Sequence, residues 1–304
     1  MRFKFSGHQT FTFRYGWLEK GIRGLLDYPD LFERQDAPVL LGVGKNMVES
    51  IRHWCCVTQL IEENANRRKT GAPALKVTSI GEKLLRPRGW DPFIEDDASL
   101  WLIHWLLVSN PSIGTTWQIA FSWFQRADFT KRELLDYVAA FAEKHGAKVK
   151  ESSLSRDIDC FIRTYTSGHS SNRQAVAEES FDCPLQELNL LHASPDGELY
   201  RFAVGHKHSL PTAVFAFALE QYFLAARVSG KTMGVQECLY GPGSPGQVFK
   251  LDENSLIAYV EDIEKTTRGK VSLDETAGLK QIYRHHEWES TKLLANYYAT
   301  EARQ

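Results

Sequence analysis

The hydrophobic positions between residues 41 and 61 recur at the spacing of a helix with one apolar face. The apolar stripe contains Met47, Ile51, Trp54, Thr58 and Ile61. The polar side carries Lys45, Glu49 and Arg52, flanked by Asn46, Ser50 and His53. A turn-rich segment at 66–73, a strand-like run at Leu75–Val77 and another helix at 78–85 follow. This order predicts a winged helix-turn-helix, a fold that lays one helix in the major groove of DNA.

The polar face of this helix supplies a first set of candidate DNA contacts. We expect the helix to approach DNA through Lys45, Asn46, Ser50 and Arg52. The segment that follows, N-R-R-K-T-G-A-P, would form the wing and touch phosphates through Arg67, Arg68 and Lys69. A solvated surface helix followed by a loop is the alternative interpretation.

A second helix-turn-helix is predicted between residues 130 and 165. Thr130 and Glu133 fit a capping box that opens its first helix, and His145-Gly146 ends it. The next helix begins at Ser152 or Ser153, and its apolar face contains Leu154, Ile158, Phe161, Ile162 and Tyr165. We expect it to contact DNA through Ser153, Arg156 and Arg163. Alternatively, Arg156 and Arg163 form intrahelical ion pairs with Asp159, for which their spacing is suited.

Prolines and glycines divide the chain into three predicted domains. Residues 1–90 form a basic winged-helix-like domain, whose last helix Ser79 and Glu82 would cap. The segment 86–93, R-P-R-G-W-D-P-F, interrupts any helix. Residues 91–177 form a helical domain with a buried helix ending at Val108, which Asp96 or Asp97 can cap. Residues 178–304 form an α+β domain.

The C-terminal domain repeats the mixture of helices and short strands. The turn S-P-D-G separates two strand-like runs, Leu188–Ala193 and Glu198–Val204. Helices are predicted near 211–228 and 254–267, with a strand at Lys270–Leu273. A third winged unit is compatible with this order. The predicted fold class is therefore mainly α with small β hairpins, built from tandem winged helix-turn-helix-like units.

The charge is distributed unevenly along the chain of 304 residues, whose net charge is −2. Residues 1–90 contain 15 Lys and Arg against 9 Asp and Glu, whereas the remainder contains 21 against 29. A basic N-terminal third indicates a surface that faces a polyanion. The alternative is that this uneven distribution of charged residues arises by chance and marks no binding surface. The five cysteines have no C-x-x-C spacing, and no apolar run is long enough to span a membrane, so we expect a cytoplasmic protein.

The sequence contains few signals for catalysis. L-G-V-G-K-N is not a phosphate-binding loop, because one residue separates its glycines, so no nucleotide cofactor is expected. Cleavage of a DNA strand commonly uses carboxylate-bound Mg²⁺, and Mg²⁺ or Mn²⁺ is the expected cofactor. No metal-nuclease motif is present. The candidate catalytic residues are His8 as an acid or base, Arg14 as a phosphate ligand, and Asp157 and Asp159 as carboxylates.

Six separated segments together resemble one bacterial family. They are F-S-G-H-Q-T-F, R-Y-G-W-L-E-K-G, the stretch 41–54, D-P-F-I-E-D-D-A-S-L-W-L-I-H-W-L-L, D-I-D-C-F-I-R-T-Y and S-F-D-C-P-L-Q-E-L. The family was long described as having unknown function. Its SspB-like members occur in DNA phosphorothioation and phage-defence gene clusters. The resemblance spans nearly the whole chain but assigns no catalytic residue.

The resemblance implies a DNA nickase, which opens one strand so that sulfur can replace a non-bridging phosphate oxygen. It also implies action beside a cysteine desulfurase, a sulfur-activating enzyme and an ATPase. Double-stranded DNA is the expected partner. Two alternatives remain open at this point: a non-enzymatic winged-helix module that recruits other proteins or regulates transcription, and a protein–protein scaffold without affinity for DNA.

Overall fold

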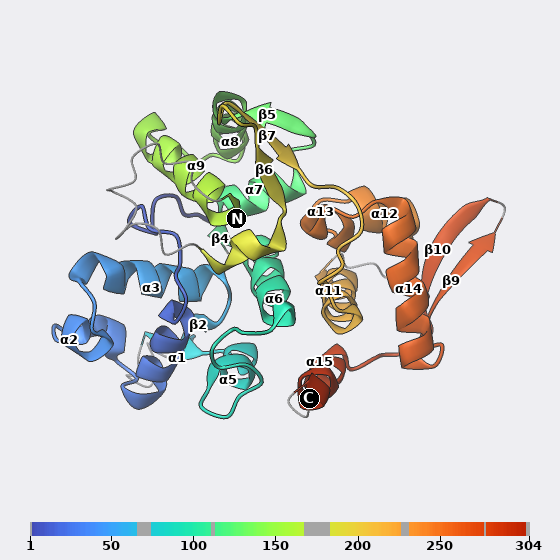
Figure 1. Ribbon diagram of the computed structural model, residues 1–304, viewed down its shortest axis with the longest axis horizontal. Coiled ribbons are helices and arrows are strands. Elements are labelled where there is room, and N and C mark those ends of the chain that lie inside the picture. The colour runs from blue at the N-terminus through green and yellow to red at the C-terminus, as the bar shows by residue number, and fades with distance from the viewer. Residues whose placement is uncertain are drawn as a thin grey trace. The chain divides into compact units, whose positions relative to one another are not determined.

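A computed structural model describes residues 2–65, 74–110, 113–166, 183–225, 231–276 and 278–301. The described chain is mainly helical with small sheets, which confirms the predicted fold class at that level (Figure 1). It forms two compact units. Unit 1 contains residues 1–120 and 126–201, and unit 2 contains residues 121–125 and 202–304. The division into three domains stays a prediction.

The described residues of the first part of unit 1 form helices and a hairpin. The helices are α1 (Trp17–Asp27), the 3-10 helix η1 (Leu31–Glu33), α2 (Ala37–Leu41), α3 (Lys45–Val57) and α5 (Ser79–Leu85). Between α3 and α5, β2 (Ile61–Glu63) pairs antiparallel with β3 (Leu75–Val77), so that α3, the hairpin and α5 follow one another in the predicted order. α1 and α3 pack closely because Gly21 has no side chain: a Cβ there would lie 2.6 Å from Cys55 Sγ.

The capping prediction for α5 is wrong by one residue. Thr78 occupies the N-cap position, and its Oγ1 accepts a hydrogen bond from the backbone N–H of Gly81 at 3.1 Å. The same hydroxyl donates to the Gln59 carbonyl at 2.8 Å, so it ties the helix to the chain before β2. Both Thr78 and Ser79 are suitable capping residues. Spacing alone therefore could not choose between them.

The second part of unit 1 surrounds a buried helix. α6 (Asp97–Val108) is capped by Asp96, and all its residues from Ala98 to Val108 are buried, as predicted. The elements that follow are β4 (Ile113–Gly114), α7 (Thr116–Ser122), β5 (Asp128–Thr130), α8 (Lys131–Lys144), α9 (Glu151–Tyr165), the 3-10 helix η2 (Pro184–Leu188), β6 (Leu191–Ala193) and β7 (Leu199–Phe202). The N-terminal strand β1 (Arg2–Phe3) pairs parallel with β4. The predicted capping box of α8 is confirmed in both halves.

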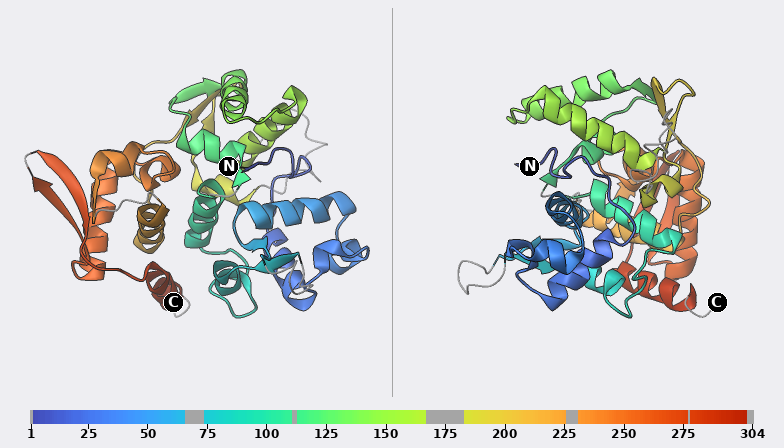
Figure 2. Two further views of the ribbon diagram at one scale, coloured as in Figure 1. Left: turned by 180° about the vertical axis from the view of Figure 1, so that it is seen from behind. Right: turned by 60° about the vertical axis from the view of Figure 1, so that its left-hand side comes forward.

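Unit 2 is built from α11 (Thr212–Ala225), β8 (Thr232–Gly234), α12 (Val235–Tyr240), α13 (Pro245–Phe249), α14 (Glu253–Thr267), β9 (Val271–Thr276), β10 (Leu279–Arg284) and α15 (Ser290–Glu301). β9 and β10 form a long hairpin beside α14 (Figure 2). Within the described ranges, no helix combines the length and apolar character that crossing a membrane requires.

One order of elements occurs twice. A helix leads to a short strand, further helices and then a hairpin, once from α7 to β7 and again from α11 to β10. In each case the first strand pairs with the last strand of the hairpin, giving the sheet orders β5-β7-β6 and β8-β10-β9. The first part of unit 1, α1 to β3, also has helices followed by a hairpin, and among the described residues its sheet contains only β2 and β3.

Candidate nucleic-acid interface

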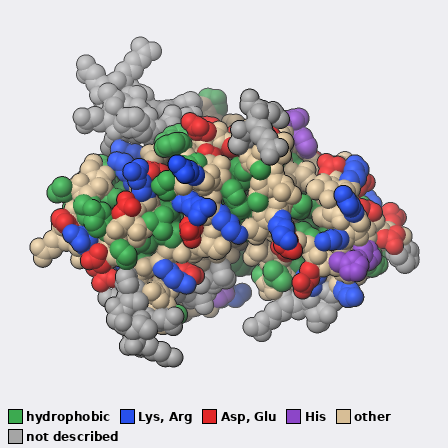
Figure 3. Space-filling model, turned by 90° about the horizontal axis from the view of Figure 1, so that it is seen from below, with side chains coloured by type: hydrophobic (Ala, Val, Ile, Leu, Met, Phe, Trp, Pro, Cys, Tyr) green, Lys and Arg blue, Asp and Glu red, His purple; other side chains and the backbone are tan. Residues whose placement is uncertain are grey.

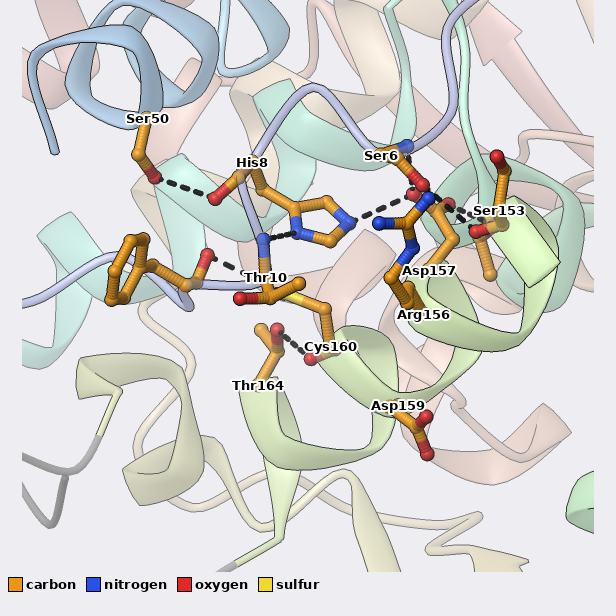
Figure 4. Close-up of polar contacts among 12 residues, drawn as sticks. Ser6, His8, Thr10, Ser50, Ser153, Arg156, Asp157, Asp159, Cys160 and Thr164 are labelled. Carbon is orange, nitrogen blue, oxygen red and sulfur yellow. Dashed lines mark hydrogen bonds and ion pairs between the residues drawn. The ribbon is translucent and has the colours of Figure 1, made fainter. Parts of the chain in front are cut away.

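The N-terminal segment of residues 6–11, here called the N-terminal strap, lies between α3 and α9 and binds both (Figure 4). Its hydrogen bonds to α9 begin at Ser6, whose Oγ donates to the Ser153 carbonyl at 2.8 Å. They end at Thr10 and Phe11, whose carbonyls accept from Arg163 at 2.6 Å and from Cys160 Sγ at 3.4 Å. On α3, Ser50 Oγ donates to the His8 carbonyl at 2.9 Å. The strap therefore bridges the two helices through hydrogen bonds to each of them.

His8 and Asp157 form the centre of this contact. His8 Nε2 lies 2.8 Å from Asp157 Oδ1, and both residues are buried, with exposed fractions of 0% and 1%. The same carboxylate accepts hydrogen bonds from the Ser6 N–H at 2.6 Å and from the Thr116 hydroxyl. Three donors thus satisfy a carboxylate that has no access to water, as a buried charge requires.

The hydrogen bonds also determine which nitrogen of His8 carries the proton. The backbone N–H of Thr10 donates to Nδ1 at 3.0 Å, so Nδ1 is an acceptor. The ring proton is therefore on Nε2, where it is donated to Asp157. The imidazole thus donates through Nε2 to the carboxylate and accepts through Nδ1. Ser6 and Thr10 have positive φ angles of 56° and 67°, and so the strap bends tightly on both sides of His8.

The structure separates the four candidate catalytic residues. His8 and Asp157 are together but sealed from solvent. Asp159, two residues later on α9, is half-exposed and forms an ion pair with Lys131. The guanidinium of Arg14 lies 5.7 Å from the centre of the Phe11 ring and 5.5 Å from that of Trp17. A phosphodiester in solution can reach Asp159, whereas it cannot reach the His8–Asp157 pair without displacing the strap.

The polar face of α3 is less open than its sequence indicates. Lys45 and Asn46 are exposed and Arg52 is half-buried, as a DNA-facing side requires. Ser50 and His53, however, are buried beneath the strap. The Ser50 hydroxyl already donates to His8, so this side chain is not available to DNA. Arg67, Arg68 and Lys69 lie outside the described residues.

His53 fills the space that the strap leaves over α3. A Cβ on Gly7 would lie 2.4 Å from His53 Nδ1, so only glycine fits there. Neither ring nitrogen of His53 has a hydrogen-bond partner among the described residues. Burial lowers the pKa of His53 well below its ordinary value, and nearby Lys4 and His8 add to the effect. His53 is thus a neutral packing residue. Its ring lies edge-on to the ring of His8, with 5.8 Å between the ring centroids.

The predicted apolar face of α9 is confirmed, because Leu154, Ile158, Phe161, Ile162 and Tyr165 are all buried. On the outer face, Arg156 and Arg163 are exposed and Ser153 is half-buried. Neither predicted intrahelical ion pair forms. Asp159 pairs with Lys131 instead, while Arg156 Nε donates to the Ser152 carbonyl at 3.2 Å. The two guanidinium groups therefore keep donors that face solvent, as phosphate ligands must.

Sequence reasoning missed two further cations beside α9. Lys148 and Lys150 are exposed, and among the described residues neither forms an ion pair with a carboxylate. The signal was the run A-K-V-K immediately before the helix. On the face drawn in Figure 3, Lys and Arg side chains are interspersed with Asp and Glu.

The described residues contain no group of three or more His, Cys, Asp or Glu side chains that could hold a metal ion. They therefore do not fit a dedicated metal cage. Mg²⁺ can also bind through one or two carboxylates together with water and substrate phosphates, and such a site would not require a cluster.

Comparison with known proteins supports the resemblance found in the sequence. The fold is similar to two crystal structures of SspB, one of them bound to a magnesium ion, with TM-scores of 0.84 and 0.83. The sequence identities are 28% and 27%, and each match covers 99% of this chain and 89% of the other. No curated protein matches. The family model described as "Protein of unknown function (DUF4007)" matches residues 5–298, and the chain belongs to this family.

Proposed function

We propose that this protein binds double-stranded DNA and nicks one strand in a bacterial phosphorothioation and phage-defence system. The observation that carries the proposal is the similarity to SspB, at 28% identity over 99% of the chain. The family resemblance supplies the system, and with it the expected partners: a cysteine desulfurase, a sulfur-activating enzyme and an ATPase.

The order of elements supports DNA binding through winged-helix units. A winged helix places a recognition helix directly before a β hairpin, so that the helix enters the major groove. In unit 1, α3 directly precedes the β2–β3 hairpin, and α9 precedes the β6–β7 hairpin with the 3-10 helix η2 between them. In unit 2, α14 precedes β9–β10. We infer that these are three tandem winged units.

The exposed cations of α3 and α9 are the proposed DNA contacts of unit 1. Lys45, Asn46 and Arg52 would contact DNA from α3, and Arg156 and Arg163 from α9, with Ser153 near its start. Lys45 and both arginines of α9 form no ion pair with a carboxylate among the described residues, so their charge is free to neutralise phosphates. Because the strap binds both helices, it would hold the two contact surfaces in a fixed relation.

The geometry supports a structural role for His8 and Asp157 and a role near DNA for Asp159. A general base must be within hydrogen-bond reach of the proton that it abstracts. The buried pair is not, whereas Asp159 lies between Arg156 and Arg163 on the outer face of α9. We propose Asp159 as the carboxylate that faces the phosphodiester, with the two arginines positioning the strand.

A second candidate function is a DNA-binding module without catalytic activity. The observation that favours it is the burial of the two most plausible acid–base residues, His8 and Asp157. Such a module would recruit the sulfur-incorporating proteins to DNA or regulate transcription. This module would make the same contacts with DNA but would not cleave the phosphodiester bond.

Incubation of the purified protein with supercoiled plasmid and Mg²⁺ or Mn²⁺ distinguishes the two functions. A nickase converts the plasmid to open circles, and chelation of the metal by EDTA should stop this conversion. A shift in gel mobility with the plasmid still supercoiled supports the module. Binding should weaken about tenfold or more between low and physiological salt if several phosphates are neutralised. A pure scaffold would show neither nicking nor salt-dependent binding.

A further inference from the structure

A cavity beside the start of α9 in unit 1 is lined by aromatic and basic side chains. Its lining residues include Phe3, Phe5, His145, Lys148, Lys150 and Ser153, and the rest of the described lining is small or aliphatic. None of these described lining residues is acidic. The neighbouring cavities on the α9 face differ in this respect, because Asp159 lines one and Glu151 and Glu198 line another.

The rings at this cavity form a continuous aromatic series. Phe5 and Phe3 stack with centroids 5.9 Å apart and an angle of only 8° between their planes. Phe3 lies 6.2 Å from His145, which stacks on Phe141 at 4.4 Å. His145 Nδ1 donates to the Phe141 carbonyl at 2.8 Å and so fixes the plane of the imidazole. Phe3 and Phe5 are half-buried and His145 is exposed, so the rings have accessible surface.

The charge around the rings is positive. Lys148 and Lys150 are exposed on the loop that leads into α9 and have no carboxylate partner among the described residues. The adjacent acid, Glu151, is already paired with Arg132, whose Nη1 lies 2.6 Å from its Oε1. Among the described lining residues, none carries a negative charge that could neutralise the two lysines.

We propose that this cavity binds a short stretch of single-stranded DNA, with bases stacked on Phe5, Phe3 and His145 and phosphates held by Lys148 and Lys150. Aromatic rings beside a basic groove bind single strands because every unpaired base offers a π face, whereas bases in a duplex are already stacked. The proposal rests on the proposed function: a nickase acts on one strand of two, and this cavity would hold a strand that has separated from its partner.

The test measures binding of a fluorescein-labelled oligothymidylate to the full chain by fluorescence anisotropy. Phe5→Leu keeps an apolar side chain but removes the ring, and it should weaken binding about tenfold or more. Phe5→Tyr restores a ring and should restore binding. Lys148→Glu with Lys150→Glu should weaken binding and lower the salt dependence by about 0.7 for each phosphate that is no longer neutralised. Lys83→Glu on α5, also exposed and in unit 1, is the matched control and should bind as the unaltered protein does.

Ultraviolet crosslinking of an oligonucleotide that contains 5-bromouracil gives a second measurement that does not depend on variants. Crosslinks should map to peptides that contain Phe3 and Phe5 or residues 145–153. Unchanged oligothymidylate binding by both Phe5→Leu and the double lysine variant, or crosslinks confined to other peptides, would overturn the proposal.

The outcome is separable from that of the proposed function. If the protein nicks plasmid DNA but these variants bind the oligonucleotide normally, only the single-strand site is rejected. If the oligonucleotide binds at this cavity but duplex DNA is neither bound nor nicked, the proposed function is rejected and the single-strand site is kept.

Discussion

His8 and Asp157 are 149 residues apart in the chain, yet the imidazole Nε2 lies 2.8 Å from the carboxylate Oδ1 in a fully buried contact. This contact attaches the N-terminal strap to α9, while the carbonyl of the same histidine attaches it to α3 through Ser50. One residue thus joins two helices that we propose as DNA contacts. Its role follows from that position: it maintains the relation between the helices.

Replacement of Asp157 by Asn should destabilise unit 1. The amide keeps one acceptor but turns the other into a donor, so the hydrogen bond from Thr116 must be lost or reversed, and the remaining bonds lose the charge of the carboxylate. We expect the free energy of unfolding to fall by roughly 1–3 kcal/mol, measured by urea unfolding followed by tryptophan fluorescence.

Asp159→Asn is the matched control, because it removes a charge from the same helix at a half-exposed ion pair. It should change the stability by less than about 1 kcal/mol. If Asp159→Asn instead abolishes nicking while leaving stability unchanged, the proposed role of Asp159 near the phosphodiester is supported. A stable Asp157→Asn protein that binds DNA but no longer nicks it would contradict the structural role of Asp157.

The periodicity of the sequence predicted most of the helices, because it depends on local burial. It wrongly extended the apolar stripe of α3 to Ile61, which lies in β2, and it did not predict β10. The apolar face of α9 and the capping box of Thr130 and Glu133 are present as expected. Periodicity could not predict that a segment distant in the sequence would cover the polar face of α3. Ser50 and His53 looked solvated because their cover, the strap, contacts them only in three dimensions.

The same limit explains the candidate site residues. The sequence grouped Asp157 with Asp159, but residues two apart on a helix point about 200° apart, which follows from 3.6 residues per turn. One carboxylate is therefore buried and the other half-exposed. Lys148 and Lys150 gave no periodic signal because they lie in the loop before α9, and binding residues often occur in such loops.

Ile51→Ala should destabilise unit 1 without a direct effect on contacts with DNA. Ile51 is completely buried on the inner side of α3. Its Cγ2 packs against Gly21 of α1, so closely that a Cβ added to Gly21 would lie only 3.0 Å from it. Truncation leaves a cavity between two helices, and we expect a loss of about 2–5 kcal/mol in the free energy of unfolding. Calorimetry or urea unfolding measures it. A loss below about 1 kcal/mol would indicate that α1 and α3 close the gap.

Lys45→Glu combined with Arg52→Glu should weaken binding of duplex DNA while leaving the melting temperature nearly unchanged. Lys45 is exposed and Arg52 half-buried on the polar side of α3. A side chain that neutralises one phosphate contributes about 0.9 to the salt dependence of binding. Removal of both cations should lower the slope of log affinity against log salt by about 2. Lys83→Glu serves as the control. Unaltered affinity and slope would remove α3 from the interface.

Unit 2 contains a buried lysine whose charge depends on pH. Lys250 is 7% exposed, and its Nζ donates to the Phe121 carbonyl at 3.1 Å and lies 4.3 Å from the centre of the Phe202 ring. Burial, together with the nearby charge of Lys207, lowers the pKa of Lys250 to about 7. Burial also lowers the pKa of Lys207, to about 8, although Asp252 opposes this shift.

The stability of unit 2 should therefore rise with pH above about 7. In the unfolded chain Lys250 has the ordinary lysine pKa of 10.5. Between about pH 7 and pH 10.5 the unfolded chain therefore binds a proton that Lys250 lacks in the folded protein, and stability rises with pH. Stability is lost as the pH falls toward 7. Lys250→Met should reduce the slope between pH 7.5 and 8.5 by about one proton, or roughly 1.4 kcal/mol per pH unit. Urea unfolding across that range measures it, with exposed Lys265→Met as the control. Equal slopes in Lys250→Met and the unaltered protein would mean that Lys250 stays protonated when folded.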